Sequence, residues 1–442
     1  MTDRKRIAVI GGGIAGLTAA FRLAQQGYQV TLWERAPQFG GQANAFPVAG
    51  TYLERFYHHL FQSDREIVAL AGEIGIGDAL MWLPSNVGYF AQGKIWPLNG
   101  AMDLLKLGTI PIHDRLRVGL VTAYLQRVRN WKPLENVTAH DWLLRALGER
   151  AYDQTFGAQL RAKFGRYHDQ VAMVWFWGKI WLRTTSRRSP LEQERLGYFR
   201  GSFNVLIDAL VAAARKAGAT LTSGTGPEKL EPTGAGGWIA TVDGERYPFD
   251  AVVVTTPSPI LPRLVDGLPP AYLRKLSALE YEAAIVVLLQ LSQPLSSVYW
   301  LNVADDDLPF TGIIEHTNFI DPEQYGGKRF VYLSKYLEQD HPYFQLTDEE
   351  ILAGYLPHLK RINTRFDPSW IEHSWVFRER AAQPIIPLHY SQQIPDHRTG
   401  LRGLYLANTT QIYPEDRGTN YSVRLGNNIA RLVNDDLAHG AK

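Results

Sequence analysis

The 442-residue chain has no cysteine, which excludes disulfide bonds, thiolate metal sites and a cysteine nucleophile. The chain also has no large excess of charge of one sign. Its formal net charge of +2 is too small for the concentrated basic face that nucleic acids require, so no nucleic-acid partner is expected. The 12 histidines are scattered, and no Ser-His-Asp set or cluster of metal ligands stands out, so no metal site is predicted.

Long apolar runs are missing as well. No stretch reaches the roughly 18 to 20 apolar residues that are needed to cross a bilayer. The basic start of the chain precedes only a short strand, whereas a signal peptide would continue into a longer apolar region and a cleavage site. We expect a cytoplasmic protein that is at most peripheral to a membrane.

Aromatic residues, in contrast, are abundant: the chain holds 12 Trp, 21 Tyr and 18 Phe against four Met. Such numbers imply large apolar surfaces, which either pack in the core or line a cavity for a flat or strongly apolar substrate. The chain is also too long for one ordinary core, so two sequential or interleaved domains are expected.

The pattern of the first thirty-five residues predicts a dinucleotide-binding unit. A strand of apolar residues runs into a glycine-rich turn, a helix follows from about Ile14 to Gln26, and a second strand ends at Glu34. In such a unit the first glycine permits the tight turn, the second lets the backbone approach a pyrophosphate, and the third allows close helix packing. The N–H groups that open the helix attract phosphate, and Glu34 is placed to accept ribose hydroxyls. The predicted contact residues are Gly11, Gly13, Ile14, Ala15, Gly16 and Glu34.

A glycine pair soon after the acid narrows the choice of dinucleotide. Arg35 follows Glu34, and Gly40 and Gly41 come after four further residues, with Gln42 next. The arrangement E-R-x-x-x-x-G-G-x resembles the flavin amine oxidase, protoporphyrinogen oxidase and phytoene desaturase superfamily, in which the glycine pair lets the chain pass close to the FAD diphosphate. Gln42 replaces the family's usual arginine. The resemblance implies FAD, and the lack of cysteine excludes a cysteinyl link, so noncovalent FAD is expected.

The next segment differs from the superfamily pattern. Where many members carry G-x-x-x-D-x-G beside the flavin ring, this chain has Gly50, Glu54 at the acid position and Phe56 at the second glycine position. His58 lies four residues after the acid, as in the related UDP-galactopyranose mutase. We take Tyr57 and His58 as candidate catalytic residues, with surface or core histidines as the alternative.

Residues 64–190 look mostly helical. An aromatic cluster of Trp175, Phe176, Trp177, Ile180 and Trp181 ends the last helix, surrounded by Lys179, Arg183, Arg187 and Arg188. Core packing is one interpretation of these aromatic residues. The other is a substrate entrance or a patch that contacts a membrane surface.

Two later segments supply further candidates. Several strands in series between residues 266 and 384 predict a mostly antiparallel sheet, which in the superfamily forms the substrate pocket; Trp375 and Arg378 on its strands are candidate catalytic residues. The apolar strand before Thr255 and Pro257, and the C-terminal strand, loop and helix, resemble the superfamily's other flavin segments. By that resemblance Thr255, Pro257, Asn408, Tyr421 and Ser422 are expected near FAD, with the helix N-terminus stabilising charge on the flavin.

The expected fold is α/β with an α+β substrate domain. A Rossmann-like FAD-binding domain of the glutathione-reductase type would comprise residues 1–75, 191–265 and 385–442. A helical insertion, 76–190, and a mostly antiparallel sheet, 266–384, would form the substrate domain.

The leading hypothesis from the resemblance is an FAD-dependent oxidoreductase, an oxidase, dehydrogenase or desaturase that takes hydride from a small, largely apolar or aromatic substrate to flavin N5. A non-redox flavoenzyme like UDP-galactopyranose mutase is the second hypothesis. A non-catalytic binding protein like the GDP dissociation inhibitors is the third, although the intact glycines and Glu34 argue against it. The sequence leaves the substrate, the electron acceptor and the oligomeric state open.

Overall fold

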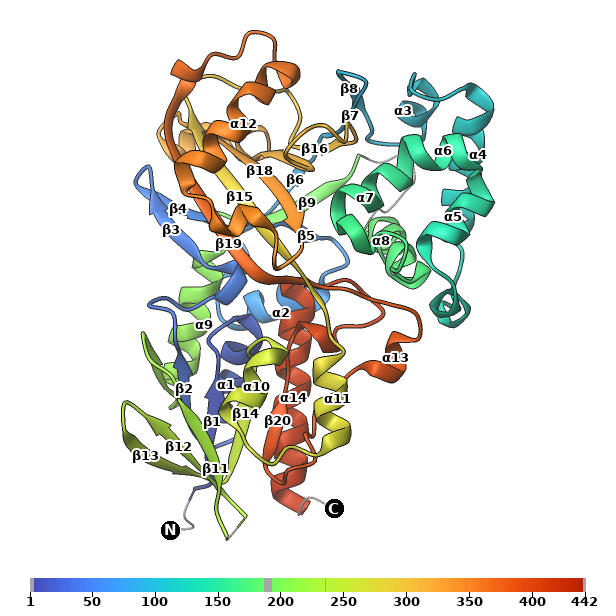
Figure 1. The fold of residues 1–442 in the computed structure, drawn as a ribbon. Coiled ribbons are helices and arrows are strands. Elements are labelled where there is room, and N and C mark those ends of the chain that lie inside the picture. Colours follow the sequence, from blue (N-terminus) through green and yellow to red (C-terminus); the bar gives the residue numbers. More distant parts are fainter. Residues whose placement is uncertain (1–3, 187–192, 235, 440–442) are drawn as a thin grey trace.

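The computed structural model describes residues 4–186, 193–234 and 236–439. In Figure 1 a nucleotide-binding part lies at the bottom, a broad sheet lies above it, and a helical part lies to one side. Arg187 and Arg188, and the boundary expected at 190/191, fall outside the described residues. In the part of the chain that is described, no helix is both long enough and apolar enough to span a bilayer.

The nucleotide-binding part is built on a five-stranded parallel sheet. Its strands, in spatial order, are β10 (Thr220–Ser223), β2 (Gln29–Glu34), β1 (Arg6–Ile10), β14 (Ala251–Val254) and β20 (Leu404–Leu406). Every residue of β14 is buried, as expected for a parallel strand with both faces covered. The sheet therefore joins segments from the start, middle and end of the chain.

Alternate residues of β1 enter two different cores. Ile7 and Val9 pack with α1 (Ile14–Gln25), α9 (Asn204–Lys216) and α14 (Thr419–His439). Ala8 and Ile10 face the other side. That side is covered by an antiparallel meander and two short helices: β11 (Lys229–Pro232), β12 (Trp238–Val242), β13 (Glu245–Phe249), α10 (Leu261–Leu264) and α11 (Pro270–Ser277).

The upper sheet has seven strands. Their spatial order is β19 (Ile371–Pro384), β15 (Tyr281–Leu291), β18 (Arg329–Leu337), β17 (Gly312–Glu315), β16 (Trp300–Val303), β7 (Val87–Ala91) and β8 (Lys94–Pro97). All neighbours are antiparallel except β16 and β7. The helix α12 (Asp348–Ile362) covers the upper face (Figure 1), while the lower face packs on the nucleotide-binding part.

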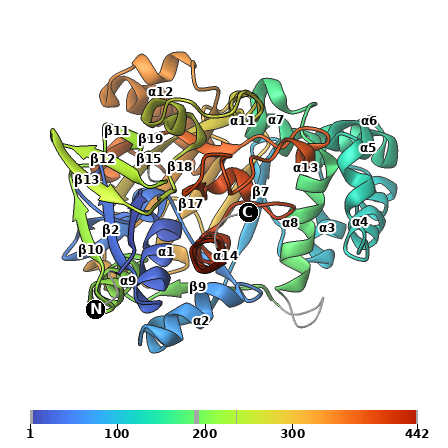
Figure 2. The ribbon, with the colours of Figure 1, turned by 90° about the horizontal axis from the view of Figure 1, so that it is seen from below.

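The helical part is shorter than expected. Residues 80–97 form β6 (Leu80–Pro84), β7 and β8 rather than helix, and these strands pair into two sheets. Helices begin at α3 and run to α8: α3 (Ala101–Lys106), α4 (Ile112–Leu125), α5 (Ala139–Leu147), α6 (Glu149–Tyr152), α7 (Ala158–Phe164) and α8 (Met173–Thr185). Viewed from below, α3 and α4 lie at the outer edge, away from α14 (Figure 2).

Short elements connect the three parts. They are the hairpin of β3 (Ala45–Val48) and β4 (Thr51–Glu54), the small sheet of β5 (Leu60–Phe61), β9 (Arg195–Phe199) and β6, and the helices α2 (Arg65–Glu73) and α13 (Tyr390–Gln393). The segment between β4 and β5, which holds Tyr57 and His58, passes between the upper sheet and the nucleotide-binding part.

Candidate active site

The glycine turn between β1 and α1 is shaped by contacts that leave no room for a side chain. A Cβ atom at Gly16 would lie 2.0 Å from the Gly11 carbonyl oxygen, and Gly11 itself has a φ of +107°. At Gly13, in contrast, the nearest atom to an added Cβ is the Gly41 Cα, at 3.9 Å. Gly16 thus serves the packing of helix on strand, while Gly13 is not required by that packing.

The glycine pair lies directly against this turn. Gly40 forms a parallel bridge with Gly13, and its N–H donates to the Gly12 carbonyl at 2.8 Å. Gly40 and Gly41 both have positive φ. Gly13 precedes α1 as its N-cap, and no side chain caps that helix end. The structure therefore brings two backbone segments and the start of a helix together, where helical N–H groups favour an anion.

Glu34 closes the turn. One carboxylate oxygen accepts the Gly12 N–H at 2.7 Å, and the other accepts the Ala36 N–H at 2.8 Å. The exposed Arg35 follows it. The Gln42 side chain donates to the Ala381 carbonyl on β19 at 2.8 Å, so it ties the glycine pair to the upper sheet.

Two further predicted contacts lie beside the turn. The Thr255 hydroxyl bonds the Ile10 and Gly11 carbonyls at 3.1 Å each, and Pro257 follows it at the end of β14. Asn408 is buried, and its amide is used within the protein: it donates to the Thr256 carbonyl and to the Ser258 hydroxyl, and it accepts from Thr410. Asn408 therefore shapes the loop around Thr255, and its side-chain amide has these partners already.

The last helix begins two residues earlier than expected. Its first residue is Thr419, whereas Tyr421 and Ser422 lie in its first turn. The Ser422 hydroxyl donates to the Gly418 carbonyl, and the Tyr421 ring packs beneath Arg424. Asn420 accepts the Glu66 and Ile67 N–H groups that open α2. The N-terminal end of α14 is thus fixed against α2 by its own side chains.

A row of hydroxyl groups follows β18 on its lower face, as the two-residue period of a strand requires. The Tyr332 hydroxyl donates to the Glu54 carbonyl at 2.7 Å, the Ser334 hydroxyl accepts from Tyr57 at 3.4 Å, and the Tyr336 hydroxyl accepts from Arg417 at 3.0 Å. One strand thereby positions the segment after β4 and the segment before α14. Among the residues that this row binds, Tyr57 was a candidate from the sequence.

His58 is held neutral. Its Nδ1 lies 2.6 Å from the Phe56 carbonyl, which only accepts, so Nδ1 carries the proton and Nε2 is the basic nitrogen. Burial, helped by the positive charge of Arg417, lowers the pKa of His58 to about 4. His58 can therefore accept a hydrogen bond at neutral pH through Nε2.

Glu54, at the acid position of this segment, is fully buried. It accepts the Tyr198 hydroxyl at 2.8 Å and the Phe203 N–H at 2.6 Å. Burial raises the pKa of this carboxyl to about 7.

A group of charged side chains lies in and around the loop before α14. We call it the cationic cluster; its members are Lys163, Lys179, Asp416 and Arg417. Asp416 pairs with Lys179 and accepts from Trp175 Nε1 at 3.1 Å and from Gln383 at 2.8 Å. Arg417 donates to the same Gln383 at 3.2 Å. Burial alone would raise the pKa of Asp416, but Lys179 and Lys163 bring it well below its ordinary value.

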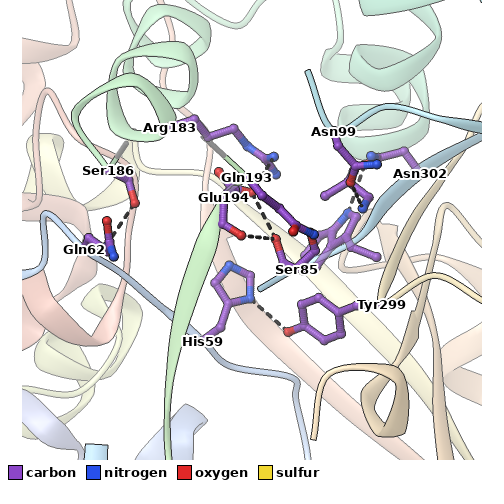
Figure 3. A network of polar contacts seen from close by, with 12 residues as sticks. His59, Gln62, Ser85, Asn99, Arg183, Ser186, Gln193, Glu194, Tyr299 and Asn302 are labelled. Carbon is purple, nitrogen blue, oxygen red and sulfur yellow. Dashed lines mark hydrogen bonds and ion pairs between the residues drawn. The ribbon is translucent and has the colours of Figure 1, made fainter. Parts of the chain in front are cut away.

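A second polar network lies beside His59 (Figure 3). Arg183 on α8 is 3.5 Å from a carboxylate oxygen of Glu194, and the Ser85 hydroxyl bonds Glu194 from the end of β6. His59 Nδ1 lies 3.1 Å from the Tyr299 hydroxyl. Burial, followed by the charge of Arg183, lowers the pKa of His59 to about 3. Nearby, the Gln62 N–H donates to the Ser186 hydroxyl at 3.0 Å, which joins the end of α8 to the chain just after β5.

The two candidates on β19 lie on opposite faces of the sheet. Trp375 faces downward, with its ring centroid 5.4 Å from that of Phe46. Arg378 faces α12, where it bonds Asp348 at 2.6 Å and the Leu346 carbonyl at 2.9 Å. Trp375 and Arg378 are three positions apart, and residues an odd number of positions apart point to opposite faces of a strand. The expectation that Arg378 lines the pocket is therefore wrong.

The aromatic cluster on α8 belongs to the core. Trp175, Phe176 and Trp177 are buried within the helical part, and Trp177 donates to the Val128 carbonyl. The interpretation of these three residues as a membrane patch is wrong. Trp175 nevertheless reaches the site through its bond to Asp416.

Sequence reasoning missed most of the cationic cluster as a site. Lys179 was visible as one of several basic residues near the aromatic cluster, and Asp416 and Arg417 as part of a loop before a helix. Lys163 was not named as a site residue. The four residues come from α7, α8 and the loop before α14, so only tertiary structure brings them together.

The parallel sheet, the glycine turn and the adjoining glycine pair together define a dinucleotide-binding protein of the flavoprotein class. The chain belongs to the flavin containing amine oxidoreductase family, whose model matches residues 14–415. It is 29% identical over 190 residues to 15-cis-phytoene desaturase of Solanum lycopersicum, covering 39% of this chain and 33% of that relative. It is 26% identical over 340 residues to carotenoid phi-ring synthase of Streptomyces griseus, covering 70% of this chain and 63% of that relative.

A solved structure shares the fold over nearly the whole chain. It is a protein provisionally named protoporphyrinogen oxidase, from Exiguobacterium sp. 255-15, with a TM-score of 0.78, 17% identity and coverage of 98% of this chain and 100% of the other. The predicted α/β fold with its α+β substrate part is confirmed.

The residues at the turn fit the family's cofactor, FAD. Gly13 and Gly41 have no Cβ atom, so their backbone is accessible to a diphosphate. The uncapped start of α1 offers N–H groups, and Glu34 supplies a carboxylate. These residues would hold the diphosphate and ribose. The contacts predicted for Arg35, Gln42, Asn408, Tyr421 and Ser422 stay predictions.

Proposed function

We propose that this chain is an FAD-dependent oxidoreductase that oxidises a substrate with a large apolar part. When bound, FAD accepts a hydride from such a substrate. The observation that carries the proposal is a group of aromatic side chains on the lower face of the upper sheet and in the segments beneath it, which we call the aromatic lining. Tyr57 lies edge-on to Trp300 at 5.0 Å and to Tyr332 at 5.9 Å, and Trp375 and Phe377 pack on Phe46.

The chain's own residues orient the substrate and exclude water. Aromatic faces hold an apolar group by area and by ring geometry. The neutral His58 offers Nε2 as a hydrogen-bond acceptor, and the Tyr57 hydroxyl is held by Ser334. Among the described residues no group of three or more His, Asp or Glu side chains could hold a metal ion, and hydride transfer requires none.

The test is anaerobic reduction of the purified flavoprotein. Porphyrinogens, carotenoid precursors and amines are offered in turn, and the flavin absorbance near its visible maximum is followed. One class of donor should bleach the flavin. A protein that keeps its flavin oxidised with every class would contradict the proposal.

A non-redox mutase is the competing function, favoured by the spacing of Gly50, Glu54 and His58. The same purified protein decides between the two. A mutase would be active on a sugar nucleotide only after the flavin had been reduced with dithionite, and would consume no electrons during turnover.

We further propose that the protein contacts membrane surfaces through α4. Ile112, Leu116, Leu120 and Tyr124 are each at least half exposed and are spaced by four residues, so they form one stripe along the helix. Met102 on α3 is 62% exposed. Exposed Lys106, Arg127 and Lys132 flank the stripe, and both helices lie at the outer edge (Figure 2). An apolar stripe with basic flanks favours an anionic lipid surface.

Co-sedimentation with vesicles tests this surface. Wild-type protein should bind phosphatidylcholine vesicles that contain phosphatidylglycerol, and the double variant Leu116→Glu/Leu120→Glu should lose binding. Leu273→Glu on α11, whose leucine is 37% exposed, is the matched control and should bind as the wild type does. If the double variant instead abolished a dimer seen by size exclusion, the occupant of the stripe would be a second copy.

A further inference from the structure

The cationic cluster holds more basic than acidic side chains. The basic ones are Lys163, Lys179 and Arg417, and the acidic one, Asp416, is already paired with Lys179. Glu282 lies close by and is buried, and burial raises the pKa of its carboxyl to about 8. Glu282 is therefore mostly protonated at neutral pH and does not balance the excess.

Lys163 is the member whose position needs an explanation. Its ammonium lies 4.9 Å from the ring centres of both Trp175 and Tyr336 and 5.7 Å from that of Phe164. Among the described residues none gives it a hydrogen bond or a carboxylate within 4.0 Å. Burial, followed by the repulsion of Lys179, lowers the pKa of Lys163 well below its ordinary value. The ammonium is stabilised by these aromatic faces, and its N–H donors have no protein acceptor among the described residues.

Four neighbouring side chains each keep part of their surface exposed: Tyr57, His58, Lys163 and Arg417. Arg417 lies close enough to each of the other three for its charge to act on their pKa values. Tyr57 also belongs to the aromatic lining of the proposed substrate site.

A cleft of about 330 Å³ lies between α7 and β18, next to the cluster. Its lining includes Ala162, which precedes Lys163, and Tyr336, which accepts a hydrogen bond from Arg417. The lining carries charges of both signs, from Arg161 and Lys335 and from Asp305, Asp306 and Glu338.

We propose that Lys163 and Arg417 bind an anionic group, a carboxylate or a phosphate, on the substrate whose apolar part lies against the aromatic lining. Arg417 presents a planar guanidinium that pairs with such oxygens, and Lys163 supplies a point charge. The substrate class is then an amphipathic anion rather than a plain hydrocarbon or an amine. The inference rests on the proposed function, because it assigns the charge of that same substrate.

The test compares four ligands that share one alkyl chain. Dodecanoate, dodecyl phosphate, dodecanol and dodecylamine are titrated below their micelle concentrations into the FAD-loaded protein, and heat and flavin absorbance are recorded. One or both anions should bind at least about tenfold more tightly than dodecanol. The stronger anion identifies the headgroup as carboxylate or phosphate.

Variants at Lys163 locate the binding. Lys163→Met keeps the length of the side chain and removes its charge, and it should weaken anion binding at least about tenfold while dodecanol binding stays unchanged. Lys163→Arg restores the charge and should bind anions within about threefold of wild type. Lys229→Met removes a lysine that is paired with Asp266 at the surface and should change nothing.

The outcomes separate this inference from the proposed function. Equal binding of dodecanol and the anions, tighter binding of dodecylamine, or unchanged anion binding by Lys163→Met would each overturn the inference alone. A protein that binds none of the four and keeps no flavin would overturn both. If Lys163→Met should not fold, Lys163→Gln provides the same comparison.

Discussion

At the scale of single residues, Gly13 and Gly16 differ in what an added side chain would meet. The 3.9 Å distance at Gly13 is ordinary van der Waals contact, whereas the 2.0 Å distance at Gly16 forces the backbone to move. We predict that Gly13→Val folds with a thermal melt close to that of the wild-type apoprotein but retains FAD at least about tenfold more weakly. The flavin-to-protein absorbance ratio after gel filtration measures the loss.

Gly16→Ala provides the contrast. It should destabilise the folded protein by about 1 to 3 kcal/mol, because the strand and helix must separate. Far-UV circular dichroism melts of both variants separate the two effects. A Gly13→Val protein that purifies fully yellow would refute the placement of the diphosphate.

Glu54 gives a prediction about pH. Its pKa is about 7 in the folded protein against 4.5 as its ordinary value. The folded chain therefore keeps a proton that the unfolded chain loses, and the free energy of unfolding falls by about 3 kcal/mol as pH rises from about 4.5 to about 7. Glu54→Gln cannot lose a proton. Urea melts should therefore show that the free energy of unfolding of the variant, relative to wild type, increases between pH 5 and pH 8.

The buried His58 and His59 change the free energy of unfolding with pH in the opposite direction to Glu54. Both histidines are present in wild type and in Glu54→Gln. Their lowered pKa values remove stability as pH falls below about 6.5, the ordinary value for histidine. Their contribution cancels in the difference between Glu54→Gln and wild type. A difference that stays constant from pH 5 to pH 8 would show that Glu54 is ionised throughout.

At the scale of elements, the crossing of α1 and α14 depends on Gly426. A Cβ there would lie 2.6 Å from the Ala15 carbonyl oxygen and from Thr18 Cβ. Gly426→Ala should push α14 away from α1, costing about 1 to 3 kcal/mol and weakening FAD retention, since the start of α14 would move with it.

The matched control is Gly354→Ala on α12, where an added Cβ meets nothing within 4 Å. There alanine should stabilise the protein by about 0.5 to 1 kcal/mol, because glycine in a helix is conformationally costly. Denaturant melts measure both changes. A Gly426→Ala protein as stable as Gly354→Ala would mean that the two helices are not in close contact.

Elements with a strong local pattern were predictable from sequence. The continuous apolar run of β14 predicted a buried strand. The strands β7 and β8 were not predictable, because β7 is buried throughout and pairs with β16 more than 200 residues later. The face of Arg378 was equally undetermined, since alternation fixes which residues share a face but not which face is covered by α12.

At the scale of the whole molecule, the site could be predicted only where one short segment contains it. The glycine turn, Glu34 and the glycine pair lie within 36 residues, and their geometry follows from that segment. The cationic cluster and the row of hydroxyls on β18 join segments that are far apart in the chain. No local pattern marks Lys163 or Tyr336, because their meaning depends on neighbours that only the folded chain supplies.

The same long-range bonds predict how the molecule unfolds. Gln42 to Ala381, Tyr332 to Glu54 and Arg417 to Tyr336 connect the nucleotide-binding part with the upper sheet. We therefore expect one cooperative thermal transition for both parts. At free FAD one hundred times its Kd, mass action adds about 2.7 kcal/mol, which raises Tm by about 3 °C in a chain of this length. Calorimetry of the protein stripped of FAD and then reloaded measures the shift, and Gly13→Val at the same FAD concentration should show at most about half of it. Two transitions, of which FAD moves only one, would mean that these bonds do not couple the two parts.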